Sequence, residues 1–180
     1  MGTLLLVGLV GGFSALSLFM WHAWIGSVQG ILLFEVALIG TLVGLEIPLL
    51  MRVLSRRLPF AALVAQVLAF DYVGALAASV LFPLLLLPAL GIVRTALLFG
   101  LTNALLAFAL CRMFRPHFQR GVRFLSHQSL AAAALLVLGL ATADTTLAWA
   151  EEQIYAAPVL IKQPKPYHTL AVTRWRDALR

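Results

Sequence analysis

Long apolar runs alternate with short connections, which carry most of the basic residues, over the first 150 positions of the chain. Crossing the roughly 30 Å of hydrocarbon in a bilayer takes about 20 mainly apolar residues in a helix. Five stretches are long enough, so the pattern predicts five transmembrane helices. They cover residues 3–25, 31–51, 61–90, 92–114 and 130–150.

The pattern changes after Ala150, where polar residues and prolines replace the apolar runs. Alternation with β-branched residues over 167–175 predicts a strand. We recognise no second strand before the end of the sequence and expect this strand to be unpaired. The predicted fold is therefore an all-α membrane protein, a five-helix transmembrane bundle (residues 1–150) with a short C-terminal extended (β) tail. Residues 151–180 are interpreted as a juxtamembrane linker and the truncated start of a soluble domain.

Composition supports this reading. Hydrophobic residues make up 62% of the chain and charged residues 11%, and one small soluble core cannot cover that much apolar surface. The net charge of +6 would suit nucleic acid, but the basic residues lie between apolar runs instead of on one surface. We expect the lipid bilayer as partner and no nucleic acid. Cys111 is the only cysteine, which excludes a disulfide within the chain.

Arginines predict the orientation in the membrane. Two predicted connections that fall on the same side hold most of them, whereas the opposite side holds only Arg94. The arginines are Arg52, Arg56 and Arg57 after the second helix, and Arg112, Arg115, Arg120 and Arg123 after the fourth. Because basic loops favour the cytoplasm, the amino terminus is expected inside and the tail outside.

Prolines and small residues predict how the helices meet. Pro83, Pro88 and Gly91 should end the third helix and let the fourth return beside it as a hairpin. Small residues four positions apart let helix backbones approach closely in lipid. Such pairs occur at Gly8 and Gly12, at Gly40 and Gly44, and at Gly100 and Ala104. The same small-residue faces allow a homo-oligomer, and Gly40 with Gly44 allows a different protein partner.

Acidic side chains within the apolar runs need a partner or a function, since each costs about 2.5–3.5 kcal/mol near the middle of a helix. Glu35 and Glu46 are eleven residues apart, which places them within roughly 20° of each other on one helix face. This face could coordinate a cation or relay protons. Alternatively it is a structural network in which Arg52 or Arg94, together with Asn103, neutralises the buried charge.

Asp71 completes the predicted intramembrane polar network of Glu35, Glu46, Asp71 and Asn103. It lies where an amphipathic entry gives way to a fully apolar run, so it either caps or tethers a helix break or serves as an ion ligand. No nucleophile with a base and no Gly-rich phosphate loop is recognisable, so no catalytic residue is predicted. Four histidines lack metal-ligand spacing, so no metal site is predicted. They are His22, His117, His127 and His168.

Three segments resemble a known family. They are Gly-Thr-Leu-Val-Gly-Leu-Glu-Ile-Pro-Leu-Leu-Met-Arg over 40–52, Phe-Asp-Tyr-Val-Gly-Ala-Leu-Ala-Ala over 70–78, and the tail from Pro166-Tyr167 through Thr-Arg-Trp-Arg-Asp over 173–177. Together they resemble bacterial membrane-bound spermidine synthases, which are polyamine aminopropyltransferases. The resemblance implies a multi-pass domain in the bacterial inner membrane that precedes a soluble, Rossmann-like synthase domain.

The family reaction moves an aminopropyl group from decarboxylated S-adenosylmethionine to putrescine. The resemblance implies that the synthase domain follows residue 180, so the chain is expected to bind no cofactor and to be inactive alone. His168 stands where the family has a glutamine that contacts the aminopropyl donor. An imidazole lacks the paired donor and acceptor of a carboxamide, so this departure bears on donor binding.

A second function also fits the sequence. The chain could be a small cation or polyamine transporter or channel module in which Glu35, Glu46 and Asp71 bind the cation. The predicted orientation also conflicts with the resemblance, because the family's donor is cytoplasmic while the arginines place the tail outside. Either the fifth helix does not cross fully, or the basic loops break the usual rule, or the synthase domain faces outward.

Overall fold

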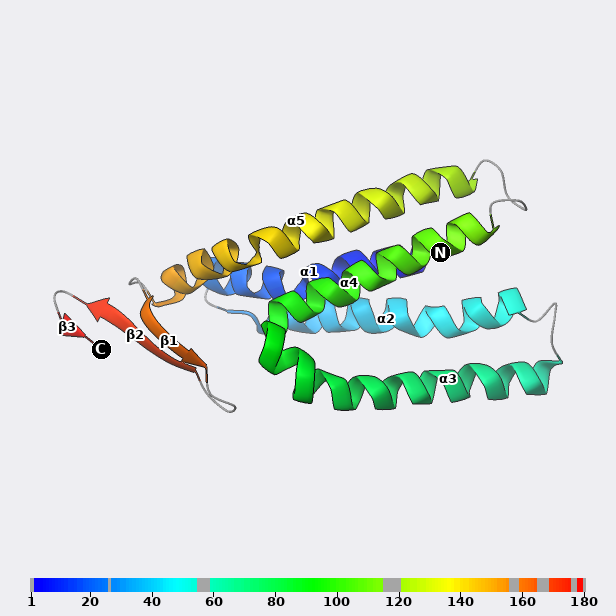
Figure 1. The fold of residues 1–180 in the computed structure, drawn as a ribbon, viewed down its shortest axis with the longest axis horizontal. Helices are drawn as coiled ribbons and strands as arrows, with labels where there is room; N and C mark the ends of the chain where they lie inside the picture. The colour runs from blue at the N-terminus through cyan, green and yellow to red at the C-terminus, as the bar shows by residue number, and fades with distance from the viewer. Residues whose placement is uncertain are drawn as a thin grey trace.

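The computed structural model describes residues 2–25, 27–54, 59–114, 121–155, 159–164, 169–175 and 178–179. Long antiparallel α-helices dominate it and form an elongated bundle, with a small sheet at one end (Figure 1). The helices are α1 (Gly2–Ile25), α2 (Gln29–Leu54), α3 (Phe60–Leu81), α4 (Leu87–Phe114) and α5 (Gly121–Tyr155), with the π-helix η1 (Phe82–Leu86) between α3 and α4.

The helical character predicted for a membrane protein is confirmed. Among the described residues, four continuous helical stretches are long and apolar enough to cross a membrane. The third of these combines α3, η1 and α4. The four stretches are Gly2–Ile25, Gln29–Arg52, Phe60–Met113 and Phe124–Ala150.

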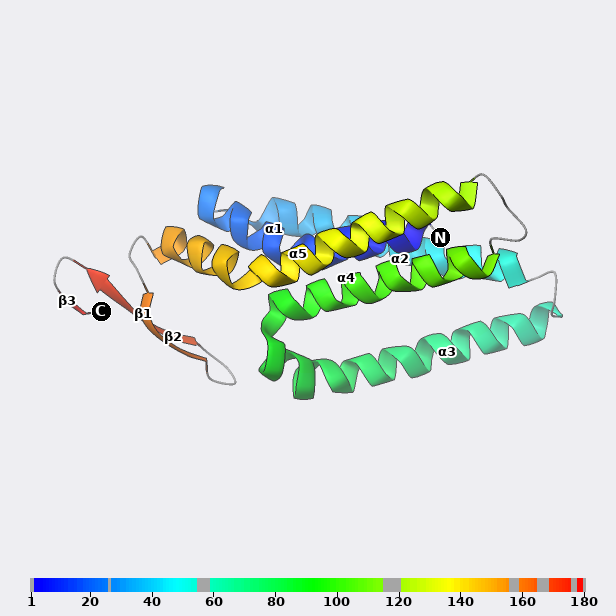
Figure 2. The same cartoon turned by 45° about the horizontal axis from the view of Figure 1, so that its top comes forward.

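Helices α1, α4 and α5 form the packed part of the bundle, and α2 and α3 flank it (Figure 2). Helix α2 lies against α1, whereas α3 contacts only α2 and η1 to any extent. Buried residues are accordingly concentrated on α1, α4 and α5. Most side chains of α2 and α3 are exposed, which suits helices that face lipid.

Helices α1 and α4 touch at glycines. A methyl group on Gly12 would lie 3.2 Å from the Cα atom of Gly100 and 2.6 Å from Cδ2 of Leu136, which reaches in from α5. A methyl group on Gly8 would lie 2.9 Å from the carbonyl oxygen of Gly100. Since no Cβ fits here, the predicted close approach at Gly8, Gly12 and Gly100 is confirmed.

The other predicted glycine pair makes no such contact. A methyl group on Gly40 or Gly44 of α2 would meet nothing within 4 Å. Nor would one on Gly74 of α3. These glycines therefore do not set the distance between helices within the described part of this chain.

The predicted hairpin between the third and fourth apolar stretches is confirmed. Helix α3 continues into η1, which contains Pro83, and the path reverses before Gly91, whose φ of 74° breaks the helical geometry. Glycine reaches positive φ without the strain that a Cβ would add. Buried Thr95 donates a hydrogen bond to the carbonyl oxygen of Gly91 at 2.7 Å, so the break leaves that oxygen satisfied.

Helix α5 is longer than the sequence predicts. It begins at Gly121, not at residue 130, and extends beyond Ala150 to Tyr155. His127 and Gln128 lower the local hydropathy without breaking the helix, and Ser129 is buried with its Oγ donating to the Ser126 carbonyl oxygen at 2.9 Å. The predicted start of the fifth helix at residue 130 is therefore wrong by nine residues.

The described residues of the tail form three strands, β1 (Val159–Pro164), β2 (Thr169–Trp175) and β3 (Ala178–Leu179), joined as an antiparallel sheet in the order β1-β2-β3. Strand β2 falls within the stretch predicted as a strand. The expectation that it lacks a partner is wrong, because Pro164 pairs with Thr169 and Lys162 with Ala171 in register. The flanking prolines make β1 resemble a linker in sequence, yet β1 is an edge strand of the sheet, where proline is tolerated.

We predict that Gly100→Ala destabilises the bundle by about 1–3 kcal/mol, because the new methyl group forces α1 and α4 apart. The matched control is Gly74→Ala, also within a helix but next to open space. It should gain stability by up to about 1 kcal/mol from helix propensity. Denaturant unfolding in detergent micelles measures both, and equal stability of the two variants would contradict the glycine contact.

Candidate functional site

Polar side chains within the apolar helices are the candidate site, and Glu35 on α2 is the best defined of them. Ser17 on α1 donates a hydrogen bond from Oγ to Oε1 of Glu35. The Ser17 hydroxyl also lies 2.8 Å from the carbonyl oxygen of Ser14. The second carboxylate oxygen of Glu35, Oε2, is buried and has no hydrogen-bond partner among the described residues.

Glu46 lies further along α2 and shares this feature. Its Oε1 atom is buried and makes no hydrogen bond within the described part of the chain. Glu35 and Glu46 both belong to the half-buried stripe of α2, which also includes Ile31, Leu38 and Leu42. Since neighbouring positions of α2 are exposed, this stripe is the side of the helix turned toward the bundle.

The two carboxylates occupy one face but lie far apart along it. Eleven residues at 1.5 Å per residue separate their Cα atoms by about 16 Å. Both therefore cannot ligate one metal ion. Consistent with this, the described residues contain no group of three His, Cys, Asp or Glu side chains arranged to hold a metal.

The other two members of the predicted network lie elsewhere. Asn103 is on α4 next to Gly8 of α1, where its Cβ lies 3.2 Å from a methyl group placed on that glycine. Asp71 is exposed near the middle of α3, which runs without a break from Phe60 to Leu81. Asp71 thus caps no helix break. In the described region, no hydrogen bond or ion pair joins any two of Glu35, Glu46, Asp71 and Asn103.

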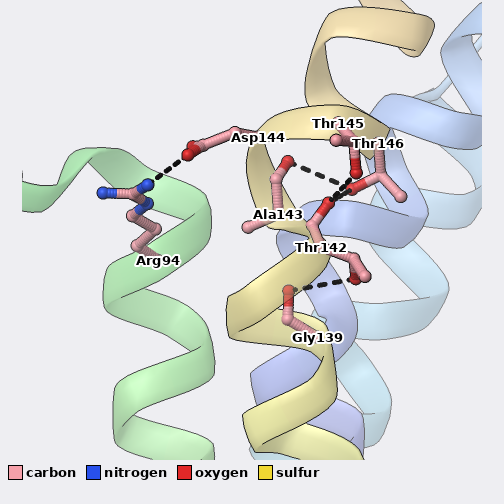
Figure 3. Close-up of polar contacts among 7 residues, drawn as sticks. All are labelled: Arg94, Gly139, Thr142, Ala143, Asp144, Thr145 and Thr146. Carbon is pink, nitrogen blue, oxygen red and sulfur yellow. Dashed lines mark hydrogen bonds and ion pairs between the residues drawn. The ribbon is translucent and has the colours of Figure 1, made fainter.

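An ion pair that the sequence reading missed joins α4 to α5. Arg94 donates from Nη2 to Oδ2 of Asp144 (Figure 3). The predicted alternative, in which Arg94 neutralises Glu35 or Glu46, is therefore wrong. Arg94 also lies within a helix and not in a connection. The two side chains keep 43% and 71% of their surface exposed, so the pair lies at the bundle surface.

Sequence position indicates the level of the two residues, although it does not show that their helices are neighbours. Arg94 follows the start of one apolar stretch, and Asp144 precedes the end of the next, so antiparallel neighbours bring them to the same level. The threonines around Asp144 do not compete for it, because Thr145 and Thr146 donate to the carbonyl oxygen of Thr142 at 2.8 and 2.9 Å (Figure 3). The pair therefore acts as a tie between helices.

Two histidines are also candidate site residues. Nδ1 of His22, near the end of α1, is buried without a hydrogen-bond partner in the described part of the structure. His168, predicted at the donor-contacting position, lies outside the described residues. The described chemistry is therefore that of buried carboxylates and one interhelical ion pair, with no arrangement for nucleophilic catalysis among those residues.

We predict that Ser17→Ala destabilises the chain by about 1–3 kcal/mol, because it removes the only described hydrogen-bond donor to a half-buried carboxyl group. Ser14→Ala is the matched control, since Ser14 Oγ donates only to the carbonyl oxygen of Gly11 in its own helix. It should change stability by less than about 0.5 kcal/mol. A double-mutant cycle with Glu35→Ala measures the coupling, and zero coupling would refute the contact.

Comparison with known proteins gives a consistent set of relatives. The chain is 44% identical over 181 aligned residues to polyamine aminopropyltransferase 2 of Ralstonia nicotianae, covering 98% of this chain and 36% of that protein. It is 40% identical to a polyamine aminopropyltransferase of Leptospira interrogans, covering 98% of this chain and 35% of that protein. The corresponding enzyme of Mycobacterium tuberculosis is 35% identical over 97% of this chain and 35% of its own length.

The chain spans about a third of the length of the curated relatives that it matches. No protein-family profile and no solved structure matches it. The similarity covers nearly the whole chain and all the relatives cited carry the same description, so it confirms the resemblance recognised in the sequence.

Proposed function

We propose, from the homology of this chain to the N-terminal third of polyamine aminopropyltransferases, that it forms the membrane-embedded portion of such an enzyme. The alignment over 98% of the chain is the observation that carries this proposal. The reaction of the whole protein is then aminopropyl transfer from decarboxylated S-adenosylmethionine to putrescine. The membrane-embedded portion anchors and orients the synthase domain.

The proposed division of the chain is a multi-pass transmembrane domain, residues 1–150, followed by a linker and the start of the synthase domain, residues 151–180. Helices α3 and α4 support five crossings, since each is long enough alone and they run in opposite directions on either side of η1 (Figure 1). Exposed Trp21, Trp24 and Trp149 support a membrane boundary at the end nearest the sheet, because tryptophan favours the interface. The proposed location is the inner membrane of a bacterium.

We predict that the purified 180-residue chain does not convert putrescine to spermidine when decarboxylated S-adenosylmethionine is supplied. The described residues show no constellation for binding the donor or activating an amine. A full-length relative, such as an enzyme aligned above, is the positive control in the same lipid and buffer. Spermidine formation by the isolated chain would overturn the assignment of an anchoring role.

The number of crossings has its own test. An odd number places the two ends of the chain on opposite sides of the membrane, whereas four crossings place them on the same side. Starting from Cys111→Ala, single cysteines at Thr3 and Ala178 should react with a membrane-impermeant maleimide from opposite sides of oriented vesicles. Labelling from one side would exclude five crossings, and loss of the protein from membranes in alkaline carbonate would exclude integral insertion.

A second candidate function is transport of a small cation or polyamine by the helical domain. The observation in its favour is the pair of buried, unpartnered carboxylate oxygens on α2, Oε2 of Glu35 and Oε1 of Glu46. Such atoms in an apolar setting attract cations. Asp71 is not a ligand in this scheme, since it is exposed on α3 and lies outside the stripe that holds Glu35 and Glu46.

We predict for this function that Glu46→Gln lowers uptake of labelled putrescine into proteoliposomes at least about tenfold, as expected when a charged hydrogen bond is lost. Asp71→Asn is the control for the loss of one negative charge and should leave uptake within about twofold. Equal flux in empty liposomes and in liposomes that contain the wild-type chain would leave only the anchoring function.

A further inference from the structure

The half-buried stripe of α2 has a chemical pattern of its own. Glu35 stands near one end and Glu46 near the other, and the stripe positions between them are the apolar Leu38, Ile39 and Leu42. Each carboxylate has one buried oxygen without a partner among the described residues. The stripe therefore presents two anionic groups about 16 Å apart along the helix, with hydrocarbon side chains between.

Among the described residues, the helices that pack against α2 supply no lysine or arginine to neutralise these groups, and Arg52 of α2 itself stands six residues after Glu46. Helix α1, which packs against the stripe, carries His22 as its single titratable side chain within Gly2–Ile25. Helix α3 carries Asp71 and Tyr72 and no basic side chain within Phe60–Leu81. Arg94, the basic residue of α4 nearest the hairpin, is paired with Asp144. A carboxylate in an apolar setting without a cationic partner is costly, so an external cation gains from binding here.

Ser17 holds the carboxylate of Glu35 in place at one end of the stripe. Its hydroxyl fixes Oε1, which leaves Oε2 as the acceptor still unfilled. An ammonium group has three donors and no acceptor, so it can fill that position without leaving an unpaired acceptor of its own. Charge-assisted hydrogen bonds of this type are among the strongest in proteins.

We propose that the seam between α1 and α2 binds an aliphatic polyamine, with two of its ammonium groups at Glu35 and Glu46 and the methylene chain that joins these two groups over Leu38 and Leu42. Two carboxylates separated by apolar side chains on α2 complement two ammonium groups separated by methylene groups in the ligand. The choice of polyamines over other two-ended cations rests on the proposed function, through the homology to polyamine aminopropyltransferases.

Equilibrium binding of labelled spermidine to the purified chain tests this site, in nanodiscs of zwitterionic lipid that lack anionic headgroups. Glu35→Gln and Glu46→Gln should each weaken binding at least about tenfold, which equals about 1.4 kcal/mol. Asp71→Asn removes the same charge outside the seam and should change the dissociation constant less than about twofold. Butylamine, which has one ammonium group, should displace spermidine poorly from the wild-type chain. Its own binding to the Glu35→Gln and Glu46→Gln variants should be equally weak.

Three outcomes would overturn the proposal: no saturable spermidine binding to the wild-type chain, an equal effect of Asp71→Asn, or competition by butylamine as strong as that of unlabelled spermidine. Circular dichroism and size-exclusion elution of each variant exclude misfolding as the cause of lost binding. Leu42→Lys is an independent test. It places a cation between the two carboxylates, which should compete with spermidine and weaken its binding. Since binding is measured without flux or catalysis, failure here leaves the anchoring function intact, and membrane extraction tests that function separately.

Discussion

The contact of Gly12 with Gly100, closed by the side chain of Leu136, determines how this bundle is arranged. In lipid, apolar surface alone does not drive helices together, because the acyl chains are as apolar as the side chains. Backbones that approach at glycine instead gain close van der Waals contact, and Leu136 fills the remaining space from a third helix with 0% of its surface exposed. Helix α1 is thereby held between α4 and α5, and α2 takes its position from α1.

The second constraint is that charged side chains within apolar helices need a partner or a solvent. The charged residues of this bundle differ in how far they have one. Arg94 and Asp144 neutralise each other at the surface of the bundle, where water or headgroups can also solvate them. Glu35 has a hydroxyl group from the neighbouring helix, and Glu46 has no described partner. The buried carboxylate oxygens without a described partner therefore lie on α2, outside the closely packed group of α1, α4 and α5.

Much of this architecture follows from sequence because lipid imposes simple requirements on length and composition. Apolar runs of sufficient length, and the Pro83 to Gly91 reversal, are local properties, and both appear in the structure. Contacts between helices depend instead on the rotation of each helix about its axis. For that reason Gly8 and Gly12 pack as expected while Gly40 and Gly44 do not, although the four share the same spacing.

The features of the structure that the sequence did not predict have physical causes of the same kind. The pairing of Arg94 with Asp144 follows from which helices become neighbours, which no single segment reveals. The early start of α5 was hidden because average hydropathy falls at His127 and Gln128 while helical hydrogen bonding continues. Strand β1 was hidden by its flanking prolines, since its stability comes from the ladder to β2 and not from its own propensity.

Helix α5 has 35 residues, so its length is about 52 Å, whereas the hydrocarbon of a bilayer is about 30 Å thick. In a bilayer, roughly 20 Å of this continuous helix therefore lies outside the acyl region. Because an unbroken helix is stiff, a change in its tilt also moves its end at Tyr155. The distance of that end from the membrane surface thus depends on the tilt of α5.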